Sequence, residues 1–144
     1  MKTKIMFDTN AYDKLQNNIP TLKHTLQKYD FYVSSIQITE ILAIPDEKKD
    51  IRNNNLRNLI ELRPTLVPTP FTFDHLNFSS FSFSPEPSYW HILKESKANR
   101  NDALIAATAI HEDCILVTDD KDLLRRMKLL EKTALTFDEF LNYN

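Results

Sequence analysis

The stretch Ile5-Met6-Phe7-Asp8-Thr9-Asn10 joins a short apolar run to three polar residues that favour the start of a helix. The apolar run has the length of a buried strand, and a helix is expected from about Ala11. A similar arrangement returns near the other end of the chain, where Ile115-Leu116-Val117 precedes Thr118-Asp119-Asp120. Short apolar strands that alternate with helices predict an α/β fold on a parallel sheet.

Further elements of both kinds lie between and beyond these two stretches. The other predicted strands are Phe31–Val33, Leu66–Val67 and, at an edge, Thr133–Leu135. One predicted helix bears Glu40; it is capped by Ser34 or Ser35 and ends before Pro45. A polar helix follows, with apolar positions from Ile51 to Leu62. The other predicted helices are Pro20–Tyr29, Tyr89–Ala98, Asn101–His111, Leu123–Leu130 and Phe137–Leu141. No repeat or domain boundary interrupts them, so residues 1–144 are expected to form a single domain.

One segment departs from this regular order. Residues 68–88 are rich in phenylalanine, proline and serine, and we expect an irregular insertion there. The aromatic content argues against a simple flexible linker. The aromatic rings either pack on the domain or a partner, or form a stacking surface for single-stranded nucleic acid.

The composition excludes several classes of protein. The chain has no glycine, which excludes the P-loop, the dinucleotide-binding fingerprint and the nucleophile elbow, and asparagines are expected at left-handed turn positions instead. No apolar run is long enough to span a membrane, and the N-terminus lacks a secretory pattern. Cys114 is the single cysteine, so no intrachain disulfide is possible and a reducing, cytoplasmic location is expected. The net charge of −2 argues against a strongly basic nucleic-acid coat.

Four acidic positions lie beside apolar segments: Asp8, Glu40, Asp102 and the pair Asp119-Asp120. Ligands of open parallel sheets bind outside the carboxyl ends of the strands, so these acids can converge at one rim. Carboxylates held together repel one another unless a cation compensates, and Mg²⁺ or Mn²⁺ suits an all-oxygen site. Each acid also has a structural interpretation as a helix cap, an exposed helix position or a first-turn acid. A metal-dependent hydrolase of phosphodiesters is the leading hypothesis.

The order of four sequence blocks resembles the PIN-domain nucleases, and especially the VapC-type toxins of type II toxin–antitoxin pairs. The blocks are Phe7–Asn10, Ser35–Ile41, Asn101–Ala107 and Leu116–Leu123, and Leu135–Leu141 resembles the closing strand and helix of the family. The resemblance implies a PIN-like α/β/α sandwich with a short, mainly parallel central sheet. It also implies a Mg²⁺-dependent endoribonuclease that uses metal-activated water, with RNA as substrate, a VapB-like antitoxin as partner and a homodimeric assembly.

Site residues follow from the same resemblance. Asp8, Glu40, Asp102 and Asp120 would be the catalytic acids that bind the metal ion, and Asn10, Thr118, Asp119 and Asp122 would support them. Basic residues flank the late blocks, and Lys97, Arg100 and Arg125 are candidates for neutralising substrate phosphates. The structural alternative for these three is a pair of solvated helix ends.

Two other functions stay open at this level. One is a PIN-type nuclease of RNA processing or DNA repair that has no antitoxin. The other is a non-catalytic binding module in which the acids hold a metal only structurally or hold none. A phosphatase with an aspartyl nucleophile is disfavoured, because Asp8-Thr9-Asn10 lacks a second acid two residues after Asp8.

Overall fold

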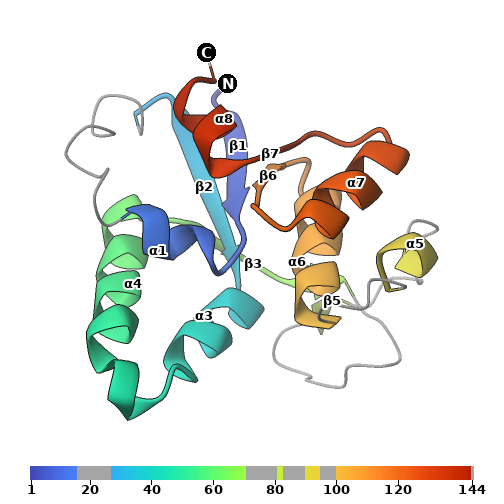
Figure 1. Cartoon of the computed structure of the whole chain (residues 1–144). Helices are drawn as coiled ribbons and strands as arrows, with labels where there is room; N and C mark the ends of the chain where they lie inside the picture. Colours follow the sequence, from blue (N-terminus) through green and yellow to red (C-terminus); the bar gives the residue numbers. More distant parts are fainter. Residues whose placement is uncertain (16–26, 71–80, 83–89, 95–99, 144) are drawn as a thin grey trace.

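The computed structural model describes residues 1–15, 27–70, 81–82, 90–94 and 100–143 (Figure 1). Five strands form one sheet: β1 (Thr3–Phe7), β2 (Tyr29–Ser34), β3 (Thr65–Val67), β6 (Ile115–Val117) and β7 (Ala134–Leu135). The order is β3-β2-β1-β6-β7 and every pairing is parallel. The predicted parallel sheet is therefore confirmed, with β1 at its centre.

The register aligns the carboxyl ends of the two strands that precede the predicted acids. Phe7 of β1 lies opposite Val117 of β6, so Asp8 and Thr118 leave the sheet at the same edge. The Asp8 N–H donates to the Val117 carbonyl at 2.9 Å, and the Thr118 N–H donates to the Leu135 carbonyl of β7 at 2.9 Å. These bonds extend the hydrogen bonding of the sheet by one residue, to Asp8 and Thr118.

Helices cover both faces of this sheet (Figure 1). They are α1 (Ala11–Leu15), α3 (Ser35–Leu42), α4 (Lys49–Leu62), α5 (Trp90–Lys94), α6 (Arg100–His111), α7 (Lys121–Leu129) and α8 (Phe137–Leu141), with a 3₁₀ turn, η1, at Asp46–Lys48. Within the described parts of the chain, no helix has both the length and the apolar character needed to cross a membrane.

Two hydrophobic clusters show how the layers are packed. Ile5 and Phe7 of β1 belong to a cluster with α1, α3, α4 and α8, whereas Met6 belongs to one with α5, α6 and α7. Successive strand residues point to opposite faces of a sheet, which explains this division. Phe7 stacks on Phe31 and meets Phe140 edge to face, with ring centroids 5.5 and 5.2 Å apart. The residue just before Asp8 is thus anchored in an aromatic core.

Two sequence-based expectations differ from the structure. Tyr29 was predicted to end a helix that begins at Pro20, but it is the first residue of β2, because its ring packs against Phe31 and Phe140. Residues 20–26 of that predicted helix lie outside the described part of the chain. Left-handed backbone occurs, among described residues, at Arg63, Asp113 and Glu131 and not at asparagines. These three exposed residues each follow a helix, where a left-handed residue closes the last turn, so the expectation of asparagine was wrong there.

The phenylalanine-rich segment is described only in part. Thr69–Pro70 (β4) and Phe81–Ser82 (β5) pair in parallel as a separate two-stranded sheet. Residues 71–80 and 83–89 lie outside the described residues, so the irregular insertion at 68–88 stays a prediction. The helix predicted at Tyr89–Ala98 is described as α5 over Trp90–Lys94.

Candidate functional site

Asp8 is the most buried acid of the candidate site, with 3% of its surface exposed. Its Oδ1 accepts a hydrogen bond from the Thr9 N–H at 2.7 Å, and its Oδ2 accepts one from the Thr118 hydroxyl at 2.9 Å. Burial raises the pKa of Asp8, and repulsion from Asp120 and Asp119 adds to this, while the two hydrogen bonds oppose it. Asp8 is therefore a carboxylate whose charge lacks full compensation within the protein.

Glu40 reaches the same edge from α3. This helix starts with a capping box, in which the Ser34 side chain and the Gln37 side chain satisfy each other's backbone N–H groups. The Gln37 amide also donates to the Phe7 carbonyl at 3.1 Å, which ties α3 to the end of β1. One turn further on, Glu40 Oε1 accepts a hydrogen bond from the Thr9 hydroxyl at 3.1 Å. Burial raises the pKa of Glu40, the hydrogen bond from Thr9 opposes this effect, and repulsion from Asp8 adds to it.

Asp102 lies in the first turn of α6, and the residues from Ala103 to Ala109 that follow it are all buried and, except for Thr108, apolar. Burial raises the pKa of Asp102 to about 7, and repulsion from Asp8, Glu40 and Asp120 contributes in that order. An acid from a third element thus lies within electrostatic reach of the other three.

Asp120 has two structural tasks at once. As the N-cap of α7, its Oδ1 accepts from the Leu123 N–H at 3.0 Å. Its own N–H donates to the Thr118 hydroxyl at 3.1 Å, and that hydroxyl in turn donates to Asp8. The cap interpretation and the site interpretation of Asp120 are therefore compatible, since one carboxylate oxygen caps the helix and the other is left for the site.

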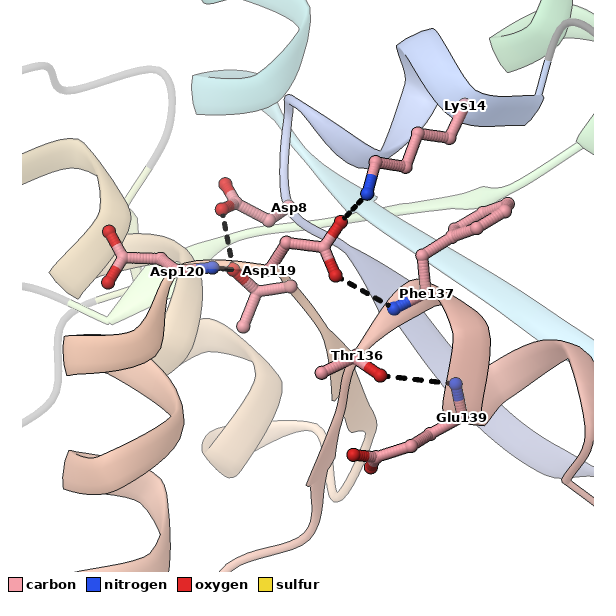
Figure 2. A network of polar contacts seen from close by, with 8 residues as sticks. Asp8, Lys14, Asp119, Asp120, Thr136, Phe137 and Glu139 are labelled. Carbon is pink, nitrogen blue, oxygen red and sulfur yellow. Dashed lines mark hydrogen bonds and ion pairs between the residues drawn. The ribbon is translucent and has the colours of Figure 1, made fainter.

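Asp119 has other partners. Its carboxylate forms an ion pair with Lys14 of α1 and accepts from the Phe137 N–H at 3.1 Å. Figure 2 shows the Asp119 side chain directed toward Lys14 and Phe137, and the Asp120 side chain on the other side of the corner. Partial burial acts to raise the pKa of Asp119, but the Lys14 and Phe137 hydrogen bonds prevail and lower it.

Of the five remaining predicted residues, four lie in the described part of the chain. Asp122 binds the guanidinium groups of Arg125 at 2.7 Å and Arg126 at 2.9 Å, on the surface of α7. Arg100 is the exposed first residue of α6, and Asn10 is exposed at the turn before α1. Lys97 lies outside the described residues. Roles for these residues in supporting the metal or binding substrate stay predictions.

Three contributors were not identified from the sequence: Thr9, Lys14 and Gln37. The Ser34-x-x-Gln37 spacing is a capping-box pattern and carried a usable signal for Gln37. The partner of Lys14 lies 105 residues away along the chain, and that of Thr9 lies 31 residues away. No local pattern encodes such pairings.

The donor set suits a hard divalent cation. It consists of carboxylates just after β1, on α3, on α6 and at the N-cap of α7, and their repulsion adds to the effect of burial in raising the pKa of Asp102. Mg²⁺ and Mn²⁺ prefer oxygen ligands and retain waters, so they need few direct protein ligands. Over the described ranges, no three His, Cys, Asp or Glu side chains are close enough to form a ready-made metal site. The arrangement can therefore bind a cation through one or two carboxylates, with the others acting through water.

Comparisons with solved structures give the fold independently. A domain of a protein of unknown function from Methanocaldococcus jannaschii aligns over 93% of this chain and 90% of its own, with a TM-score of 0.59 and 14% identity. VapBC2 from Rickettsia felis, bound to a DNA fragment from its promoter, aligns over 93% and 98% with a TM-score of 0.59 and 19% identity. PAE2754 from Pyrobaculum aerophilum aligns over 99% and 96% with a TM-score of 0.50 and 18% identity. At these identities the likeness shows the fold alone.

Sequence comparison gives the family. Curated protein sequences give no match to this chain. The sequence profile of the PIN domain, however, matches residues 5–129, which run from β1 to the end of α7. The resemblance seen in the four sequence blocks is thereby confirmed, and the chain belongs to the PIN domain family.

Proposed function

We propose that this protein is a Mg²⁺-dependent endoribonuclease and the toxin of a VapBC-type toxin–antitoxin pair. PIN domains are in general nucleases. The observation that carries the proposal is the gathering of Asp8, Glu40, Asp102 and Asp120 from four elements, close enough that the other three help to raise the pKa of Asp102 to about 7. Acids that only cap helices do not need to lie near one another, so a purely structural role does not explain the repulsion among four carboxylates at one edge of the sheet.

Each residue has a defined task in this proposal. Asp8, Asp102 and Asp120, with Glu40, would hold the cation directly or through water, and the cation when bound would supply positive charge at the scissile phosphate and acidify a water. The Thr118 hydroxyl orients Asp8 as a donor and receives the Asp120 N–H as an acceptor. The Thr9 hydroxyl orients Glu40 in the same way. Asn10 and Asp122 are supporting residues around this centre, and Arg100, Arg125 and Lys97 are candidates for contacts to RNA phosphates.

The partner and the location belong to the same proposal. The similar Rickettsia felis structure contains a VapBC2 complex, which supports an antitoxin partner for this chain. We place the protein in the cytoplasm, as a homodimer, with a VapB-like protein that blocks the acidic edge. A purification together with the product of an adjacent gene, and growth arrest on expression alone, would support this toxin role. Growth without arrest would favour a nuclease of RNA processing or DNA repair.

The catalytic part is tested by cleavage of RNA with purified protein. Asp8→Asn and Asp102→Asn should abolish cleavage in Mg²⁺ or Mn²⁺, and chelation of the cation should do the same. The matched control is Asp30→Asn, an exposed aspartate on β2 at the other end of the sheet. Wild-type activity in both site variants would contradict the proposal. Mn²⁺ binding with no cleavage by the wild type would favour the non-catalytic binding module.

A further inference from the structure

The corner after β6 directs two neighbouring carboxylates to opposite sides. Asp120 lies with the candidate metal site, while Asp119 reaches Lys14 of α1 and the N–H of Phe137 at the start of α8 (Figure 2). Asp119 is thus the point where three chain segments meet. Its neighbours Thr118 and Asp120 both belong to the hydrogen-bond chain that ends on Asp8.

The two segments held by Asp119 are coupled to the site. Helix α1 starts three residues after Asp8, and its first N–H, that of Ala11, donates to the Asp8 carbonyl at 2.9 Å. Helix α8 follows β7, whose Leu135 carbonyl accepts from Thr118. Displacement of α1 therefore moves Asp8, and displacement of α8 moves the Thr118–Asp120 corner.

Aspartate and lysine are both charged at neutral pH at their ordinary pKa values, so Asp119 and Lys14 form a pair of opposite charges. Side-chain exposures of 50% and 39% leave the pair accessible to water. Exposed ion pairs add little to the free energy of unfolding. The Lys14–Asp119 pair would therefore act on local geometry, that is, on how α1 and α8 lie relative to the corner after β6.

We propose that the Lys14–Asp119 ion pair, together with the Phe137 N–H, is a clamp that sets the separation of Asp8 and Asp120, so that Asp119 is a positioning residue for the cation site and not a ligand. This inference rests on the proposed function, since it assigns a task to that same site. Loss of a group that orients a metal ligand commonly costs about ten- to a hundredfold in metal affinity or activity.

Charge alone predicts a different result, which makes the clamp testable. Removing the positive charge of Lys14 near an acidic site would tighten cation binding, whereas removing the negative charge of Asp119 would weaken it. The clamp predicts weaker binding in both cases. The decisive variant is therefore Lys14→Met, because charge alone predicts tighter cation binding and the clamp predicts weaker cation binding.

The experiment measures Mn²⁺ affinity of the full-length protein by calorimetry, beside RNA cleavage and the thermal unfolding midpoint. We expect Lys14→Met and Asp119→Asn each to weaken Mn²⁺ binding about tenfold, to lower kcat with little change in KM, and to leave the unfolding midpoint nearly unchanged. The double variant should be no weaker than Lys14→Met alone. Lys14→Arg keeps the charge and the pairing and should restore binding.

The control is Lys121→Met, which removes an exposed positive charge next to Asp120 without touching the clamp. Its Mn²⁺ affinity should be unchanged or tighter. Tighter or unchanged binding in Lys14→Met, or no Mn²⁺ binding by the wild type, overturns the clamp. A wild type that binds Mn²⁺ but cleaves no RNA, with weaker binding in Lys14→Met, overturns the proposed function and leaves the clamp intact.

Discussion

Replacement of Asp102 by asparagine should stabilise the metal-free protein at alkaline pH. The folded protein raises the pKa of Asp102 from 3.8 to about 7, chiefly by burial and then by repulsion from Asp8, Glu40 and Asp120. The folded state therefore keeps a proton that the unfolded state loses, and stability falls as the pH rises from about 4 to about 7. Asparagine carries no charge in either state, so Asp102→Asn escapes this loss.

The size of the effect follows from the change in pKa. A change of about three in pKa corresponds to about 4 kcal/mol. Asp102 is only partly buried, so screening by solvent reduces the expected gain to about 1–2 kcal/mol. For a chain of this length that is about 3–6 °C in unfolding temperature.

The assay is thermal unfolding followed by circular dichroism in EDTA, at about pH 5 and about pH 8. Asp102→Asn should unfold at a higher temperature than the wild type at the higher pH and lose most of that advantage at the lower one. Saturating Mn²⁺ should reverse the order, because the cation stabilises the carboxylate set of the wild type. Asp30→Asn serves as the exposed control. A variant that is less stable than the wild type at the higher pH in EDTA would refute the reasoning.

Three further predictions concern Thr118, Ser34 and Cys114. Thr118→Val removes the hydroxyl shared by Asp8 and Asp120 and should cost about 1–3 kcal/mol in urea unfolding and weaken Mn²⁺ binding; an unchanged midpoint would contradict it. Ser34→Ala breaks the capping box of α3 and should cost about 1 kcal/mol in the same measurement. The Cys114 thiol, whose pKa burial raises to about 12, should react with a disulfide reagent at neutral pH only after denaturation; rapid reaction of the folded protein would count against it.

Much of the fold could be predicted because its signals are local. The apolar runs of β1, β2, β3 and β6, the edge strand β7 and the helix capped at Ser34 all lie where the sequence places them. Tyr29 was misplaced because its burial depends on Phe31 and Phe140, the second of which is distant in sequence. The left-handed positions carry no glycine and so no local mark.

The residues of the candidate site also divide into those that local sequence predicts and those that only the fold brings together. Asp8 and Asp120 could be predicted at one edge because both follow strands whose carboxyl ends must align in a parallel sheet. Glu40 and Asp102 were noted as acids beside apolar segments, but the resemblance to a family was needed to assign them to the site, since a helix alone does not reveal which face meets the sheet. Thr9 and Lys14 contact partners far along the chain, which only the folded structure brings together.

The neighbouring acids Asp119 and Asp120 show the boundary most clearly. The sequence by itself determined that an acidic corner follows a buried strand, while the alternation of strands and helices predicted the α/β fold and the order of four sequence blocks indicated the family. The resemblance to a family had already ranked Asp120 above Asp119 as a metal ligand, but only the tertiary structure showed that Asp119 binds Lys14 and Phe137 on the other side. The physical reason is that successive side chains of an extended segment point in opposite directions. What each one meets depends on how α1 and α8 pack against the sheet.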